Sequence, residues 1–114
     1  MTEIRLPFPV SVNDMYGNNK GAGRGRFVMP EYAQWRADAT ICLYQQQVRP
    51  ILGRVVVHID LDDTRQGDCD NRIKPILDLL VKEGTLGGDS KKYVKRVSIG
   101  WESIEGCRIA LETA

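Results

Sequence analysis

The sequence lacks long hydrophobic runs, and none of its apolar stretches approaches the ~20 residues that a membrane-spanning helix needs. Its first ten residues, MTEIRLPFPV, contain neither a basic start nor a long apolar segment, so we expect no signal peptide. Cysteine is scarce and odd in number. Cys42, Cys69 and Cys107 lie far apart, which favours reduced thiols in a cytoplasmic protein. The sequence therefore argues against secreted, membrane-spanning and disulfide-stabilised classes.

The length and composition fit one folded domain. The chain has 114 residues, of which 42% are hydrophobic and 27% are charged, values ordinary for a globular protein. A chain of this size can bury a core without disulfides or a structural metal. We find no internal repeat, low-complexity tract or linker, so we expect a single domain over residues 1–114.

Charge is balanced overall but unevenly distributed. Sixteen basic and fifteen acidic side chains leave a net charge of +1, which by itself predicts no partner. Residues 60–70 hold five aspartates and one arginine, whereas residues 20–26 hold three cations and residues 91–96 hold four. An acidic segment flanked by basic ones suits a site that holds metal cations and contacts a polyanion. The alternative is a solvated loop whose charges are scattered by chance.

The first half of the chain predicts a strand, a loop and a helix. Residues 3–6 are typical of a short strand, and the glycine-rich segment 16–26 predicts a mobile loop. A helix is predicted over residues 30–48, with Pro30 in its first turn. Its expected apolar stripe has spacings of three and four residues and consists of Ala33, Ala37, Ile41, Tyr44 and Val48.

The second half predicts a central strand, a second helix and two further strands. Residues 54–61 are dense in β-branched side chains and predict a central strand with alternate residues facing the core. A second helix is predicted after an N-cap at Asp70, and Pro75 indicates a tightened first turn as one alternative. Its expected core stripe is Ile73, Ile76, Leu77, Leu80 and Val81. Alternation over 93–102 and 107–111 predicts a C-terminal β-hairpin.

These elements together predict an α+β fold with a mixed β-sheet. We expect the two helices to pack on one face of this sheet.

Two aspartates stand between the predicted central strand and the second helix. On an extended segment, Asp68 and Asp70 would point to the same side, about 7 Å apart. Hard cations such as Mg²⁺ and Mn²⁺ prefer oxygen ligands, and a cation relieves the repulsion between neighbouring carboxylates. Lys74 follows one helical turn later, where it could stabilise an oxyanion or orient a phosphate. As a general pattern, however, Asp-x-Asp is weak, and such pairs are more often loop caps.

Several blocks of the sequence resemble the RusA family of Holliday junction resolvases. LPFPVSVNDMY at 6–16 is similar to the family's Leu-Pro-x-Pro-x-Ser-x-Asn opening, and Tyr32 with Trp35-Arg36 resembles its helical Tyr-x-x-Trp-Arg. DCDNRIKPILDLL at 68–80 matches the diagnostic Asp-x-Asp-Asn-x-x-Lys block, which a helical aspartate follows. Asp89 falls at the spacing of the third family carboxylate. One departure is the Leu86-Gly87-Gly88 segment, where the family usually has an aromatic residue and a second acid.

The resemblance implies a homodimeric, Mg²⁺-dependent endodeoxyribonuclease of bacterial or phage origin, for which Mn²⁺ could substitute. It implies that four-way DNA junctions are resolved by paired symmetric nicks that leave 5′-phosphates, in recombination and repair. The implied metal ligands are Asp68, Asp70 and Asp89, with Lys74 assisting catalysis. No organic cofactor and no membrane partner are expected.

Contacts with DNA phosphates are expected from the basic segments, because Lys and Arg bind the backbone with little sequence information. The candidate residues are Lys20, Arg24, Arg26, Arg72, Lys91, Lys92, Lys95 and Arg96. Their alternative role is a solubilising surface.

Other polar residues are interpreted as structural. We expect His58 to be a structural strand residue and Cys69 to be a bystander, since a thiolate would select softer metals. Asp60, Asp62 and Asp63 are expected to be solvated at the strand end, and Asp78 is expected to lie on the exposed side of the second helix.

Symmetric nicking requires two active sites, and therefore a two-fold dimer of this one-domain chain. Sheet-edge pairing and helix packing around Trp35 both remain open as its interface. Two other functions compete with the nuclease. One is a non-catalytic branched-DNA-binding protein of the same family. The other is a transferase that holds a nucleotide diphosphate through Asp-x-Asp. The sequence argues against the transferase, because it lacks a doubly wound pattern and a phosphate-binding glycine turn.

Overall fold

A four-stranded mixed sheet forms the centre of the protein. The computed structural model describes residues 1–18 and 25–114. Strand β4 (Val55–Asp62) pairs in parallel with β5 (Val94–Glu102) and antiparallel with β6 (Cys107–Thr113), and β6 pairs antiparallel with β1 (Thr2–Leu6). The order across the sheet is β1-β6-β4-β5. The predicted central strand is therefore confirmed.

Alternation along β4 determines which face of the sheet is covered. Val55, Val57, Ile59 and Leu61 are at most 1% exposed, whereas the residues between them are partly exposed. Ile109 and Leu111 of β6 are buried on the same face. Because successive strand side chains point to opposite faces, these residues all lie against the helical layer.

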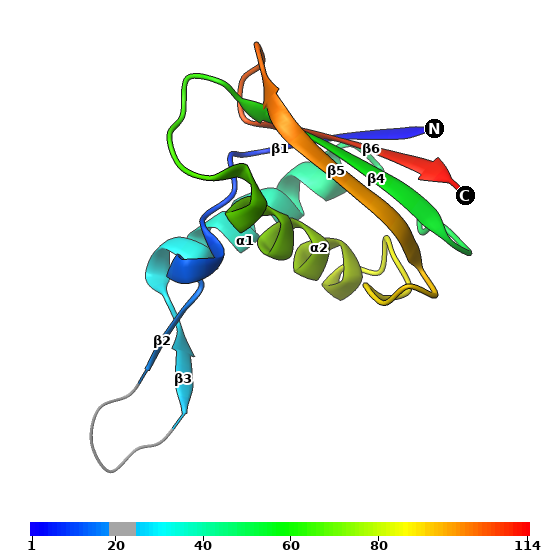
Figure 1. Ribbon diagram of the computed structural model, residues 1–114. Helices are drawn as coiled ribbons and strands as arrows, with labels where there is room; N and C mark the ends of the chain where they lie inside the picture. Colours follow the sequence, from blue (N-terminus) through cyan, green and yellow to red (C-terminus); the bar gives the residue numbers. More distant parts are fainter. Residues whose placement is uncertain (19–24) are drawn as a thin grey trace.

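Both helices lie on that one face of the sheet, as predicted (Figure 1). Helix α1 covers Pro30–Gln45, and helix α2 covers Ile73–Lys82. Two short 3₁₀ turns complete this layer, η1 (Val12–Asp14) and η2 (Cys69–Arg72). Within the described parts of the chain, no helix combines the length and hydrophobicity required to cross a membrane.

The apolar stripe predicted for α1 is wrong. The buried side chains are Tyr32, Trp35, Ala39 and Leu43, whereas Ala33 and Ala37 of the predicted stripe are exposed, Ile41 is 54% exposed and Tyr44 is 70% exposed. The buried stripe has spacings of three and four residues, as the predicted one does. It contains the larger aromatic rings, which bury the most apolar surface. The helix also ends three residues earlier than predicted, at Gln45.

Helix α2 starts as a tightened turn rather than at an Asp70 N-cap. The 3₁₀ turn η2 precedes it, and Pro75 is its third residue, where a missing N–H leaves no intrahelical bond unmade. Of the predicted stripe, Ile76 and Leu80 are fully buried, while Ile73, Leu77 and Val81 are half-buried. Leu79, which was not in the predicted stripe, is buried as well.

The predicted C-terminal hairpin is wrong in its pairing. Strands β5 and β6 are joined by a short loop, but each pairs with β4, which lies between them. The loop passes around the end of β4, where the N–H groups of Asp62 and Asp63 donate to the carbonyl oxygens of Gly106 and Glu102 at 3.0 Å. The expected alternation of Cys107, Ile109 and Leu111 into the core is confirmed.

A second, two-stranded sheet projects from the body of the protein (Figure 1). It pairs β2 (Tyr16–Asn18) with β3 (Arg26–Val28), so both flanks of the predicted loop are strands. Within this sheet the Arg26 guanidinium lies 4.4 Å from the centroid of the Tyr16 ring. Residues 19–24 lie outside the described residues, and with them the predicted DNA contacts Lys20 and Arg24.

The burial of Cys107 predicts unequal thiol reactivity. Burial raises the pKa of Cys107 to about 12, and its side chain is inaccessible, whereas Cys42 and Cys69 are partly exposed. Because the thiolate is the reactive form, we expect a disulfide reagent at pH 8 to label Cys42 and Cys69 in the native protein. Cys107 should react only after unfolding, as mapped by mass spectrometry. Native labelling of Cys107 as fast as that of Cys42 would contradict this packing.

Candidate metal and nucleic-acid site

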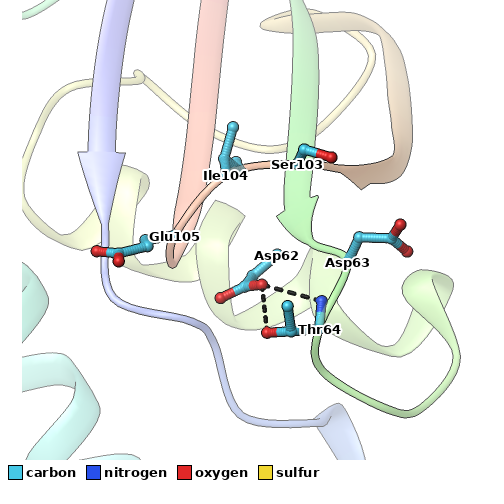
Figure 2. Close-up of a pocket in the computed structure, with 6 residues that line it drawn as sticks. All are labelled: Asp62, Asp63, Thr64, Ser103, Ile104 and Glu105. Carbon is cyan, nitrogen blue, oxygen red and sulfur yellow. Dashed lines mark hydrogen bonds between the residues drawn. The ribbon is translucent and has the colours of Figure 1, made fainter.

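The turn that leaves β4 is held by a buried carboxylate. Asp62 is only 7% exposed, and its Oδ1 accepts hydrogen bonds from the backbone N–H and the hydroxyl of Thr64 at 3.0 and 2.6 Å (Figure 2). Its Oδ2 accepts a hydrogen bond from the Gly106 N–H at 3.4 Å. The prediction that Asp62 is solvated is therefore wrong. The Asp-x-Thr sequence is the signal for this turn, because such side chains bond the backbone two residues on.

The surface beside this turn is hollow. A cavity of about 410 Å³ is lined by Asp62, Asp63, Thr64 and residues 103–105 of the β5–β6 loop (Figure 2). Asp68 and Asp70 do not line it. The hollow therefore lies at the carboxyl ends of β4 and β5, the end at which ligands bind in open α/β units.

Arg72 fixes the segment that carries the Asp68–Asp70 pair to the N-terminal part of the chain. Its Nη1 donates to the Pro9 carbonyl oxygen at 2.9 Å, and its Nη2 donates to that of Gln66 at 3.3 Å. The guanidinium also lies 5.0 Å from the centroid of Phe8, a ring that stacks on Trp101 at 6.3 Å and has the Arg65 guanidinium 5.1 Å away. Arg72 is predicted to contact DNA; in the structure its Nη1 and Nη2 groups each donate one hydrogen bond within the protein. Sequence reasoning missed this clamp because its partners are backbone carbonyls, which carry no side-chain signal, and Pro9 lies 63 residues away.

Asp68 and Asp70 are both exposed beside the clamp, where the chain enters α2. Asp68 keeps an extended backbone with φ −94° and ψ 130°, whereas Asp70 belongs to the 3₁₀ turn η2. The prediction that the two carboxylates point to the same side assumes that the whole segment is extended. That assumption is wrong at Asp70. The pair therefore starts a helix, where backbone N–H groups and the helix dipole add positive potential.

Lys74 lies on the first turn of α2 and is paired. Its Nζ lies 3.3 Å from Oδ2 of Asp78, one turn further along the helix. Asp78 was expected on the exposed side, but its side chain is only 27% exposed. The Asp78 side chain lies near Tyr32. The pKa of Tyr32 is raised to about 12, mainly by burial and then by the charges of Tyr16 and Asp78. The Lys74 side chain remains 54% exposed.

The structure does not bring Asp89 to this pair. Asp89 lies in the loop between α2 and β5, which is joined to the amino-terminal end of β4 through the hydrogen bond from Val55 N–H to the Tyr93 carbonyl oxygen. Asp68 and Asp70 lie at the other end of α2, whose ten residues rise about 15 Å. Among the described residues, no three His, Cys, Asp or Glu side chains lie close enough together to hold a metal ion. The expected three-carboxylate cage therefore does not form within one chain.

The loop that carries Asp89 is packed against a tyrosine ring. A Cβ atom at Gly87 would lie 2.6 Å from the Tyr93 ring, and one at Gly88 would lie 2.7 Å from it. Both glycines therefore allow the ring to approach the backbone, and this part of the loop is packed rather than loose. The Thr85 carbonyl oxygen also accepts a hydrogen bond from the Ile51 N–H at 2.9 Å. This packing opposes a swing of Asp89 along α2.

The cations predicted to bind DNA are distributed over two regions. Lys91, Lys92, Lys95 and Arg96 are exposed next to Asp89, and the Lys92 ammonium lies 5.4 Å from the Tyr93 ring centroid. Arg26 is exposed on the projecting β2–β3 sheet. The positive charge thus lies mostly at the Asp89 end of α2, away from Asp68 and Asp70.

The face of the sheet opposite the helices carries a separate polar network. Asp60 forms an ion pair with Arg108, whose Nη2 and Nε lie 2.7 and 2.9 Å from Oδ2 of Asp60. The ring of His58 lies 2.8 Å from Ser98 Oγ and 3.1 Å from Glu112 Oε2. These bonds support the structural interpretation of His58, and they show that Asp60 is paired rather than only solvated.

In sequence comparisons, no protein-family model and no curated protein matches the chain. The resemblance to the junction resolvases therefore depends on the motifs themselves.

The hydrogen bonds to Asp62 predict an acid-sensitive contribution to stability. The Thr64 hydroxyl and N–H hold the pKa of Asp62 below its ordinary value of 3.8. A lowered folded-state pKa stabilises the fold above the unfolded value, and this contribution is lost as the pH falls through the folded one. We therefore expect Asp62→Asn to lower the thermal midpoint at pH 7, with a difference from wild type that shrinks below about pH 4.

Asp63→Asn is the matched control, because Asp63 is exposed and adjacent. It should leave the midpoint close to that of the wild type at both pH values. If the difference in thermal midpoint between Asp62→Asn and the wild type stays constant from pH 7 to pH 3, that result would contradict a role for the charged carboxylate.

Proposed function

We propose that the protein is a Mg²⁺-dependent endodeoxyribonuclease that resolves four-way DNA junctions as a homodimer. The observation that carries the proposal is the exposed Asp68–Asp70 pair at the start of α2, with Lys74 in the first turn of the helix. These residues lie beyond the carboxyl end of β4, in a β4–α2–β5 unit with parallel strands. They are also the residues of the motif that most resembles the resolvases.

The donor set fits a hard divalent cation. Mg²⁺ is usually bound through one or two carboxylates together with substrate phosphates and waters, so Asp68 and Asp70 are the kind of protein ligand that it uses. When bound, such an ion lowers the pKa of a coordinated water and polarises the scissile phosphate. In this proposal the Lys74 side chain neutralises charge that develops on the phosphate oxygens.

The reaction is a hydrolysis that needs no further reactant. A water oxygen forms a bond to phosphorus, the bond from phosphorus to the 3′-oxygen breaks, and that oxygen takes up a proton. The products are a 5′-phosphate and a 3′-hydroxyl. The Lys74 ammonium pairs with Asp78 at 3.3 Å.

A second copy of the chain offers a route for Asp89 to reach the site. Within one chain, α2 separates Asp89 from Asp68 and Asp70, and the Tyr93 packing holds it there. A two-fold dimer in which the α2 helices run in opposite directions would place Asp89 of each copy beside Asp68 and Asp70 of the other. The exposed cations that flank Asp89, from Lys91 to Arg96, would then adjoin the carboxylate pair and the bound phosphates.

A non-catalytic branched-DNA-binding protein remains the second candidate. It is favoured by the separation of Asp89 from the other two carboxylates within the chain. The two candidates share DNA binding and differ in metal-dependent cleavage.

Substitution of one ligand should separate binding from cleavage. We expect the wild-type protein with Mn²⁺ to nick a synthetic four-way junction. Asp70→Asn should nick at least about 100-fold more slowly, since a charged ligand lost from a metal site removes several kcal/mol of transition-state stabilisation. Junction binding in a gel-shift assay should persist. Asp38→Asn, which changes an exposed aspartate of α1, should nick at the wild-type rate.

Failure of the wild-type protein to cut a junction that it binds in Mn²⁺ would overturn the nuclease and leave the non-catalytic protein.

Mixing two inactive variants should test the shared site. Asp70→Asn and Asp89→Asn are each expected to be inactive, but a mixed dimer contains one site with all three carboxylates. After co-refolding at equal concentrations, about half of the dimers are mixed if subunits exchange at random. These dimers should restore nicking of one strand. If the mixture stays as inactive as its components while the wild type is active, Asp89 does not act across the dimer.

A further inference from the structure

The two edge strands of the main sheet differ in whether another part of the chain bonds to their outer backbone groups. At the β1 edge, the Gln46 side chain takes the place of a neighbouring strand. The Arg5 N–H donates to Gln46 Oε1 at 2.7 Å, and Gln46 Nε2 donates to the Arg5 carbonyl oxygen at 2.7 Å and to that of Cys42 at 2.8 Å. Unpaired edge groups are a template for association, so this side chain blocks pairing at β1.

The opposite edge, along β5, has no such cover among the residues that the structure describes. β5 is nine residues long and pairs on one side only, with β4. Three of its helix-side residues, Val97, Ile99 and Trp101, pack against the core but are only half-buried. A regular edge strand of this length with partly exposed apolar side chains can accept another strand.

We propose that β5 of one chain pairs antiparallel with β5 of a second copy, around the middle of the strand near Ser98. The two four-stranded sheets would then form one continuous sheet of eight strands. The register shift opposite Val55 and Val56 leaves Lys95 as an extra residue, so with the axis at Ser98 the regular antiparallel pairing covers residues 96–100.

Charge along β5 fits this antiparallel arrangement. Lys95 and Arg96 lie in its first half, and Glu102 is its last residue. With a two-fold axis at Ser98, Arg96 of one strand lies diagonal to Glu102 of the other, within reach of long side chains. The symmetry produces this pair twice. A parallel arrangement would instead bring like charges together.

The pairing also has a consequence for the metal site, and this step rests on the proposed function. In an antiparallel pair, the start of one β5 lies beside the end of the other, one strand spacing of about 5 Å away. The Asp89 loop precedes β5 by a few residues, and η2 packs near β5 in the helical layer. Both copies keep their helices on the same face. Pairing at the β5 edge would therefore bring Asp89 of one copy towards Asp68 and Asp70 of the other.

A disulfide across the two-fold axis tests the pairing directly. Directly opposite residues of paired strands have Cα atoms 4.5–5.5 Å apart, a separation that a disulfide spans. We therefore expect Ser98→Cys to form a covalent dimer under mild oxidation, seen on a non-reducing gel and lost on reduction. Glu3→Cys is the matched control, because Glu3 lies in the same row across the sheet, through Ala110 and His58, but on the edge that Gln46 blocks.

The outcomes distinguish the interface from the function. Folding of each variant is checked by circular dichroism, with the wild-type protein as the baseline for its own free thiols. A covalent Ser98→Cys dimer without nicking by the wild type keeps the β5 interface and overturns the nuclease. Nicking by the wild type with no Ser98→Cys dimer, or an equal yield from Glu3→Cys, overturns the β5 interface.

A charge swap provides a second test that leaves Ser98 in place. In analytical ultracentrifugation, Arg96→Glu and Glu102→Arg should each raise the dimer dissociation constant about tenfold, because two attractive pairs become repulsive. The double variant should return it to within about threefold of the wild-type value, since the opposite charges face each other again. Single variants that dimerise like the wild type, or a double variant no tighter than the singles, would contradict the antiparallel register.

Discussion

The parallel pairing of β4 with β5 is the constraint on which the arrangement of the molecule depends. Parallel neighbours require a crossover, and α2 returns the chain along the helical layer from one end of the sheet to the other. The pairing is stabilised by burial of alternate β4 residues beneath both helices. As a result, the chain before α2 and the chain after it lie at opposite ends of the sheet. The acids of the candidate site are separated for the same reason.

Side-chain contacts then fix the chain at each end of the β4–α2–β5 unit. At the carboxyl end of β4, the Asp62 turn and the Arg72 clamp hold the segment that displays Asp68 and Asp70. At the amino end of β5, the Gly87-Gly88 backbone accepts the Tyr93 ring and fixes the Asp89 loop. Neither end is loose, so the candidate site is preorganised as two separate halves. Assembly of two copies is then a more direct way to join the halves than a movement within one chain.

Much of the fold could be predicted because burial leaves a clear period in the sequence. The β4 alternation and most of the α2 stripe are strong signals, since each has one apolar face. The α1 face could not be assigned, because its sequence holds two apolar stripes and only packing selects the one with Tyr32 and Trp35. The hairpin was missed because a short loop between alternating segments looks the same whether its strands pair directly or around an inserted strand.

The candidate site was predictable to a different degree. The exposed pair and Lys74 follow from a local motif, whereas the position of Asp89 depends on the direction of α2 and the pairing of β5, which no local pattern encodes. The most direct measurement is a crystal structure of the protein soaked with Mn²⁺. The account predicts an ion within ~2.0–2.5 Å of oxygens from Asp68 and Asp70, with Asp89 of a second copy beside it. An ion bound elsewhere, or a dimer that leaves Asp89 far from both pairs, would contradict it.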